Sequence, residues 1–350
     1  MKNMSRVLLA LALVAILAIG FGSVATAQEG DVALGPVTSA IIERGELNCG
    51  ANNAVQGFGF VNEAGEFTGL DVDFCRAVAA AVLGDANAVN FRPVVASERG
   101  AVMQSGEVDL MVRNTTWTLS RDSEWGVIFG PTTFYDGQGV GTRAEFAVGS
   151  IAELDGTSMC VQSGTTTELN ITDYITANGL DIELVVFPDA NSTWEGFLGG
   201  ACESWTTDKS GIAAFHVTAA DPSEFVILPE TLSKEPLGPL SPQSDPQFAE
   251  IVAWVHFGMV TAEELGINSE NVMDFLDSED PVVQRFLGTN NNRSGSYLGL
   301  ADDFMVNVIS QVGNYGEVYA RNLDPLGLSR AGSPNALWTQ GGLIYAPPFR

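Results

Sequence analysis

Short apolar runs alternate with helical segments along this chain, and the alternation predicts a layered α/β fold. Val108–Val112 is a largely apolar run whose length and composition suit a strand covered on both faces. Phe74–Leu83 is rich in alanine and is predicted to be a helix, whereas Asn90–Val95 alternates like a strand. Because strand–helix–strand units join parallel strands, we expect mostly parallel sheets flanked by helices.

Two stretches interrupt this pattern and divide the chain. The first stretch is Tyr135–Gly141, which contains three glycines, and the second is Leu228–Asp245, which contains four prolines. Between them, a second strand–helix series starts near Ser150. We therefore expect two lobes joined by two hinge crossings, at Gly137–Arg143 and Leu232–Ser241, with a cleft between them. The expected division is residues 1–27 as a signal peptide, residues 28–142 and 236–350 as a discontinuous first lobe with a C-terminal extension, and residues 143–235 as the second lobe.

The polar loop after Val108–Val112 carries the first candidate ligand-binding residues, Arg113, Asn114 and Thr116. It leaves the carboxyl edge of the predicted sheet, which is where open α/β sheets bind ligands. Ser120 is predicted to cap a helix with Arg121 in its first turn, where the helix dipole disfavours a cation. Arg121 therefore forms either a surface ion pair with Asp122 or Glu124, or a bidentate clamp on a ligand carboxylate.

The second series supplies two further candidates. Gly164, Thr165 and Thr166 follow a predicted strand, and Thr165 and Glu168 have the spacing of a capping box, which leaves free amides at a helix start. Asp208 lies at another junction between a strand and a helix. For both, simple helix capping is the alternative to ligand binding.

Composition narrows the classes of function. The formal net charge of −27 makes binding to nucleic acid or to an anionic membrane surface through general electrostatics unfavourable. The chain has three lysines and two histidines, His216 and His256, so catalytic designs based on these residues have few candidates. No Cys/His cluster indicates a metal, and we expect no cofactor.

The N-terminus has the pattern of a secretory signal. Lys2 and Arg6 precede the apolar stretch Val7–Phe21, and Ala25–Ala27 has the small residues of a cleavage site. We therefore expect export, with cleavage after Ala27. Four cysteines in an exported chain favour disulfides, and order along the chain favours two bridges that each lie inside one lobe, namely Cys49–Cys75 and Cys160–Cys202.

Several blocks in order resemble the periplasmic solute-binding proteins of polar and general L-amino-acid ABC importers. They include TGLDVDFCRAVAAAVLGD from Thr68, QSGEVDLMVRNTTWTLSRD from Gln104, CVQSGTTTELN from Cys160, TTDKSG from Thr206 and SKEPLGP from Ser233. The resemblance implies the two-lobed periplasmic-binding-protein fold of type II, a periplasmic location, an L-amino acid as ligand, the permease of an ABC importer as partner, and a monomer.

The resemblance also assigns roles to the candidate residues. It implies that Arg121 binds the ligand α-carboxylate with Asn114 and Thr116, that Gly164–Thr166 closes on the same carboxylate, and that Asp208 receives the α-ammonium. The first-strand loop Ala54–Gly57 lacks the aromatic residue of smaller relatives, and Arg113 adds a positive group. We therefore expect broad specificity, or acidic or amide side chains.

Two rival functions remain open, and the first of them uses the same fold. A periplasmic dehydratase acting on a cyclohexadienyl acid would need a general acid or base in the cleft, and His216 and His256 lie outside the blocks expected to line it. A sensory module would report amino acids to a receptor without transport. The sequence favours a binding protein that is not an enzyme.

Overall fold

The computed structural model describes residues 32–350, so the expected signal peptide and its cleavage site lie outside the described residues. The first lobe is built on a five-stranded sheet of order β5-β1-β6-β15-β7, in which β1 pairs in parallel with β5 and β6. β15 returns from the second lobe and pairs antiparallel with β6 and β7. The strands are β1 (Leu47–Ala51), β5 (Val89–Pro93), β6 (Leu110–Met111), β7 (Val127–Phe129) and β15 (Leu240–Pro242).

Helices and a small hairpin sheet cover this lobe. The predicted alanine-rich helix is α3, and it begins earlier than expected, at Leu70. It packs against β1 and against α9, whose buried face includes Phe248 and Val255. The elements are α2 (Pro36–Arg44), α3 (Leu70–Leu83), α4 (Arg99–Ser105), α5 (Leu119–Glu124), α9 (Pro246–Glu264), β2 (Ala54–Val55), β3 (Gly59–Val61) and β4 (Phe67–Thr68).

The second lobe repeats the plan with the strand order β11-β10-β12-β9-β13. β10 pairs in parallel with β11 and β12, as the strand–helix–strand pattern predicts, and β9 and β13 run antiparallel where the chain enters and leaves the lobe. The elements are β9 (Gln138–Arg143), β10 (Ser158–Gln162), β11 (Glu183–Phe187), β12 (Ser204–Asp208), β13 (Phe225–Ile227), α6 (Thr166–Asn178), α7 (Ala190–Leu198) and α8 (Lys209–His216).

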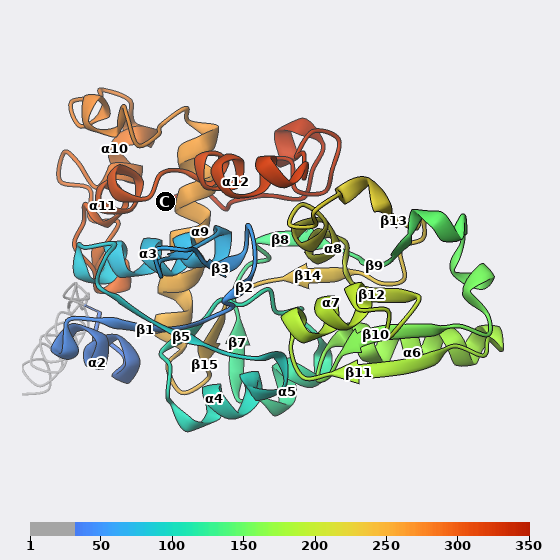
Figure 1. Ribbon diagram of the computed structural model, residues 1–350. Helices are drawn as coiled ribbons and strands as arrows, with labels where there is room; N and C mark the ends of the chain where they lie inside the picture. The colour runs from blue at the N-terminus through green and yellow to red at the C-terminus, as the bar shows by residue number, and fades with distance from the viewer. Residues whose placement is uncertain (1–31) are drawn as a thin grey trace, which may run out of the picture. The chain divides into compact units, whose positions relative to one another are not determined.

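A two-stranded antiparallel sheet forms the hinge between the lobes. It pairs β8 (Phe134–Asp136) with β14 (Glu235–Leu237), and Figure 1 shows both strands between the two five-stranded sheets. The expected crossing at Gly137–Arg143 is wrong in its residues, because Gln138–Arg143 is strand β9 of the second sheet. Gly139 and Gly141 alternate along this buried strand, and the side chains of Lys209 and Trp205 pass close to them. These glycines therefore permit close packing and do not mark a loop.

The C-terminal extension is helical and contains α10 (Pro281–Leu287), α11 (Phe304–Gln311) and α12 (Tyr315–Leu323). α11 and α12 are separate helices, because Gly313 between them has a φ of 98° and Asn314 starts α12 with a capping box. α11 packs on α3 and α9, and α12 packs on α9. The extension is therefore part of the first lobe's core.

Both predicted disulfides are present. Cys49 bonds to Cys75, which joins β1 to α3, and Cys160 bonds to Cys202 inside the second lobe. Each bridge stays within one lobe, so neither restrains movement at the hinge. Among residues 32–350, no helix combines the length and apolar character that crossing a membrane requires.

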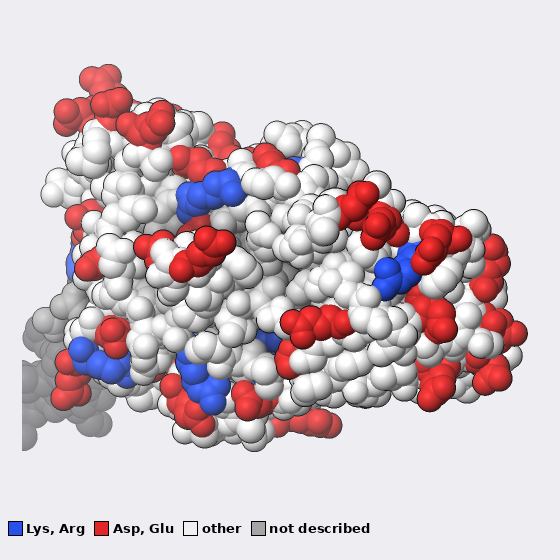
Figure 2. All heavy atoms as spheres, in the orientation of Figure 1, with Lys and Arg blue, Asp and Glu red and all other residues white. Residues whose placement is uncertain are grey.

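On the face that Figure 2 shows, acidic side chains are widely spread, whereas lysines and arginines form a few separate spots. The acidic excess read from the sequence is therefore largely a solvated surface. The exceptions include the charges buried where the lobes meet, and also Asp73 and Asp245 within the first lobe.

We predict that His256 makes stability depend on pH. Its side chain is buried among Phe74, Phe257 and Tyr315, and burial lowers its pKa from an ordinary value of 6.5 to about 4. Below pH 6.5, His256 is protonated in the unfolded chain but stays neutral in the folded protein until the pH approaches 4. The free energy of unfolding should therefore fall by about 3 kcal/mol between pH 6.5 and 4.

Guanidinium unfolding at several pH values measures this decline. His256→Gln should reduce it. Phe286→Leu, a core substitution in the same lobe at a residue with no ring contact to His256, should lower stability equally at every pH. An unchanged decline in His256→Gln would refute the assignment to His256.

Candidate functional site

A group of charged side chains is buried where the two lobes meet. The guanidinium groups are 2–7% exposed, and two of the carboxylate residues, Asp208 and Glu235, are 8% and 1% exposed. Mutual charge interactions connect the members across both lobes. The group consists of Arg99, Arg113, Arg121, Asp71, Asp208 and Glu235, with the partly buried Asp136 beside them.

The predicted loop after β6 is held rigidly. Arg113 Nε donates to the carbonyl oxygen of Val94 at 2.6 Å. The N–H of Asn114 donates to Asp71 Oδ2 at 2.6 Å, and its side-chain oxygen accepts from Asn52 at 3.0 Å. Asn114 has a φ of 31°, a left-handed conformation that asparagine tolerates better than most residues. These bonds fix the start of the loop.

Arg121 lies at the other end of the loop on α5. The cap of α5 is Thr118, whose hydroxyl oxygen accepts from the N–H of Arg121 at 3.3 Å, so the expected cap at Ser120 is wrong by two residues. Arg121 Nη1 donates to the carbonyl oxygen of Thr116 at 3.0 Å, and the guanidinium lies 5.3 Å from the centre of the Trp125 ring.

The local ion-pair alternative for Arg121 is not realised. Within the part of the chain that the structure describes, Arg121 forms no salt bridge with Asp122 or Glu124. Burial lowers the pKa of Arg121, although the charges of Glu235 and Asp208 partly oppose this effect. A guanidinium held this way retains donors for an anion.

Thr116 and Thr166 bring the two lobes together at one carboxylate. Their hydroxyl oxygens are 3.4 Å apart, and both hydroxyls donate to Glu235 Oε2, at 2.5 Å from Thr116 and 2.9 Å from Thr166. Asn170 and Ser233 donate to the other carboxylate oxygen. Glu235 lies on hinge strand β14, so the hinge itself supplies an anion to hydroxyls from both lobes.

The start of helix α6 in the second lobe has two roles: Thr165 caps the helix, and Gly164 contacts the first lobe. Thr165 is the cap of α6 and accepts from the N–H of Glu168 at 3.1 Å, and the N–H of Gly164 donates to Glu168 Oε2 at 2.8 Å. The carbonyl oxygen of Gly164 accepts from Arg99 Nη2 at 3.2 Å. A Cβ added at Gly164 would lie 2.8 Å from Ser97 Cα, so only glycine permits this approach.

Asp208 ends β12 and forms the acidic end of the site. Its side chain does not cap α8, so the capping alternative is wrong. Burial raises its pKa well above the ordinary range, and the neighbouring Asp136 and Glu235 raise it further. Burial also raises the pKa of Asp136 to about 6, although Asp136 accepts from the N–H groups of Gly137 and Ser210.

Sequence reasoning missed four members of this group. Arg99 and Asp71 lie on helices, whereas Asp136 and Glu235 lie on hinge strands that pair with each other. Asp71 and Glu235 belong to blocks that carried the resemblance, but the spacing of these residues along the chain gives no sign that they meet. Among residues 32–350, no cluster of histidine, cysteine and carboxylate side chains has the arrangement of a metal site.

The arrangement can hold a ligand with charges at both ends. Guanidinium and hydroxyl donors suit an anion, and Asp208 with Asp136 suits a cation. Burial destabilises the charged form of each group, so an opposite charge supplied by a ligand would offset that cost.

We predict that affinity for a ligand with an ammonium group falls on acidification. Because the pKa of Asp136 is about 6 and that of Asp208 is raised well above its ordinary value, these carboxylates take up protons as the pH falls and lose their attraction for a cation. Affinity should change by roughly tenfold per pH unit for each proton that ligand binding displaces. Calorimetric titration at pH 8, 6.5 and 5 measures this change.

Asp208→Asn should weaken binding at pH 8 and flatten the dependence on pH. Equal affinity at all three pH values in the unmodified protein would contradict the assignment of the acidic end.

The chain is similar to known proteins over most of its length. Residues 47–270 match the model of the bacterial extracellular solute-binding proteins, family 3. The chain is 43% identical over 342 residues to the general L-amino acid-binding periplasmic protein AapJ of Rhizobium johnstonii, covering 96% of this chain and 99% of that protein. It is 42% identical over 338 residues to the glutamate/glutamine/aspartate/asparagine-binding protein BztA of Rhodobacter capsulatus, covering 94% and 98%.

A solved structure is similar over nearly the same length. It is an ABC-transporter periplasmic binding protein from Brucella ovis with glutathione bound, which has a TM-score of 0.86 and 42% sequence identity and covers 89% of this chain and 99% of that one. A match of this length reaches into the C-terminal extension.

Proposed function

Because the chain belongs to the bacterial extracellular solute-binding proteins of family 3, we propose that it binds L-amino acids in the periplasm and delivers them to an ABC importer. In this proposal the lobes close on the charged backbone end of the ligand. Arg121, Thr116 and Thr166 bind the α-carboxylate, and Asp208 receives the α-ammonium. Asn114, Arg113, Gly164 and Thr165 hold the surrounding loops in place.

One observation carries the proposal. Arg121 and Asp208 are both buried where the lobes meet, Arg121 without a salt bridge and Asp208 without a side-chain hydrogen bond in the described part of the chain. Burying such groups is costly unless a partner compensates them. A zwitterion compensates both at once.

The names of the relatives support recognition of the ligand through its α-ammonium and α-carboxylate groups. They describe general L-amino acids, four amino acids with acidic or amide side chains, and glutathione. Glutathione also carries an α-ammonium and an α-carboxylate, on its γ-glutamyl residue, so this group is common to all of them. For this chain we propose broad specificity, with acidic and amide side chains favoured because Arg99 and Arg113 add positive charge beside Arg121.

We propose further that the protein is a monomer that docks with the importer's permease, and that the signal is removed after Ala27. The expected lobes are 28–142 with 236–350, and 143–235. We propose the same division with one change: the first boundary lies after residue 137, so that β9 belongs to the second lobe.

The enzymatic alternative has little support among the described residues. His216 lies among Trp194, Trp205 and Phe225, and His256 is buried among aromatic residues of the first lobe. Burial lowers the pKa of both to about 4. Neither is a member of the charged group, so we propose that the protein is not an enzyme.

We predict that Arg121→Ala and Asp208→Ala abolish amino-acid binding in a folded protein. Removing one member of a desolvated charge pair costs about 2 to 5 kcal/mol, which weakens binding by roughly 30-fold to several thousand-fold. Calorimetric titration with all twenty amino acids measures the loss and the rank order of ligands.

Asp122→Ala is the matched control, because Asp122 lies next to Arg121 and is the partner that a surface ion pair would use. It should leave affinity unchanged. Near-native affinity in both Arg121→Ala and Asp208→Ala would overturn the assignment of the site.

A further inference from the structure

We infer that Asn335, in the C-terminal extension, is a positioning residue for ligand binding, because it fixes hinge strand β8 to the first lobe. The inference rests on the proposed function only in that it requires the lobes to close on a ligand. Asn335 is 4% exposed and lies 200 residues from the strand that it contacts.

The side-chain amide of Asn335 bonds to both backbone groups of Tyr135. The N–H of Tyr135 donates to Asn335 Oδ1 at 2.7 Å, and Asn335 Nδ2 donates to the carbonyl oxygen of Tyr135 at 2.9 Å. Tyr135 is opposite Pro236 in the hinge sheet, and proline has no N–H to donate. A single side chain therefore supplies the donor and acceptor that a third strand would supply.

Asn335 is itself held to a core helix. Its carbonyl oxygen accepts from Arg330 Nε at 3.0 Å, and Arg330 Nη1 forms a 2.7 Å ion pair with Glu263 on α9. The Arg330 guanidinium lies 4.9 Å and 5.2 Å from the ring centres of Tyr315 and Tyr319. A continuous series of contacts thus runs from α9 through Arg330 and Asn335 to the hinge.

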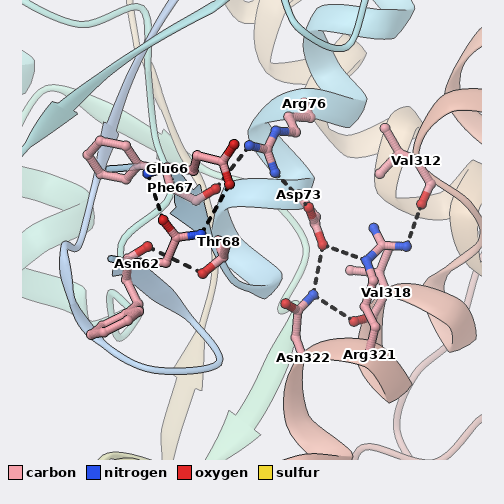
Figure 3. A network of polar contacts seen from close by, with 11 residues as sticks. Asn62, Glu66, Phe67, Thr68, Asp73, Arg76, Val312, Val318, Arg321 and Asn322 are labelled. Carbon is pink, nitrogen blue, oxygen red and sulfur yellow. Dashed lines mark hydrogen bonds and ion pairs between the residues drawn. The ribbon is translucent and has the colours of Figure 1, made fainter. Parts of the chain in front are cut away.

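A second attachment fastens the extension to α3. Figure 3 shows Asp73 of α3 between Arg76 on one side and Arg321 and Asn322 of α12 on the other. Arg321 Nε and Asn322 Nδ2 donate to Asp73 Oδ2 at 2.8 Å and 2.7 Å, and Arg76 Nη1 bonds to Asp73 Oδ1 at 3.2 Å. The segment that carries Asn335 therefore follows helices that are fixed to the first lobe.

The extension also holds the chain just before β8. The Tyr315 hydroxyl donates to the carbonyl oxygen of Thr133 at 2.7 Å. With Thr133 and Tyr135 both fixed, bending on this side of the hinge has to occur after Tyr135. The next residue is Asp136, which contributes to the acidic end of the site. Asn335 thereby determines the position of Asp136 relative to the first lobe when the lobes close.

The test compares Asn335→Ala and Asn335→Asp with the unmodified full-length protein. Loss of the two bonds lets the hinge adopt more conformations, which ligand binding must then restrict, so affinity should fall. We expect about tenfold weaker binding in Asn335→Ala, equivalent to about 1.4 kcal/mol. The probe is the amino acid that the unmodified protein binds most tightly, titrated by calorimetry.

Hydrogen exchange of the Tyr135 amide separates positioning from general destabilisation. Asn335→Ala removes the acceptor of this N–H, so its exchange should accelerate without ligand while amides of β10 stay protected. Asn335→Asp keeps the acceptor and removes only the donor, so the Tyr135 amide should stay protected while affinity falls. If Asn335→Ala does not fold, Asn335→Asp still carries the affinity test because it has nearly the same shape.

Asn307→Asp is the matched control, since Asn307 lies on α11 of the same extension and its side chain makes none of the described hydrogen bonds. It should change neither affinity nor exchange. Unchanged affinity in both Asn335 variants would refute the inference. If the unmodified protein binds no amino acid, the proposed function fails. Unchanged hydrogen exchange of the Tyr135 amide in Asn335→Ala would separately refute the attachment of β8 by Asn335.

Discussion

The cost of removing charges from water is the constraint on which this structure depends. Three guanidinium groups and several carboxylates are buried where the lobes meet. Burial shifts the pKa values of the three arginines and of Asp71, Asp136 and Asp208 in the direction that favours the neutral form. Asp71 illustrates the balance, because burial raises its pKa to about 7 although Asn114 donates to it and Arg113 lies near. The group persists because its members partly compensate one another.

Glu235 connects this electrostatic balance to movement. Its carboxylate accepts from Thr116 of the first lobe and Thr166 of the second, and it lies on a strand of the hinge. The lobes therefore meet on an anion that belongs to the protein. A ligand carboxylate in the proposed site would compete for the same hydroxyl donors, so closure and ligand binding depend on one small set of hydrogen bonds.

The C-terminal extension gives the hinge a fixed base. The extension adds no strand to either sheet, yet it reaches α3, α9 and the backbone of β8. A hinge is useful when its bending is confined to a few residues, because each additional flexible residue must be ordered when the ligand binds. Helical packing against the first lobe confines the bending here.

The sequence by itself determined the features that depend on local order: the strand–helix alternation, both disulfides, and the polar loop from Arg113 to Arg121. These follow from periodicity, cysteine order and the chemistry at strand ends. Only the tertiary structure decided that Glu235 lies between Thr116 and Thr166, that Arg99 reaches Gly164, and that Asn335 binds Tyr135. Those contacts join residues between 65 and 200 positions apart, and no local pattern specifies them, because their partners are set by how the lobes pack.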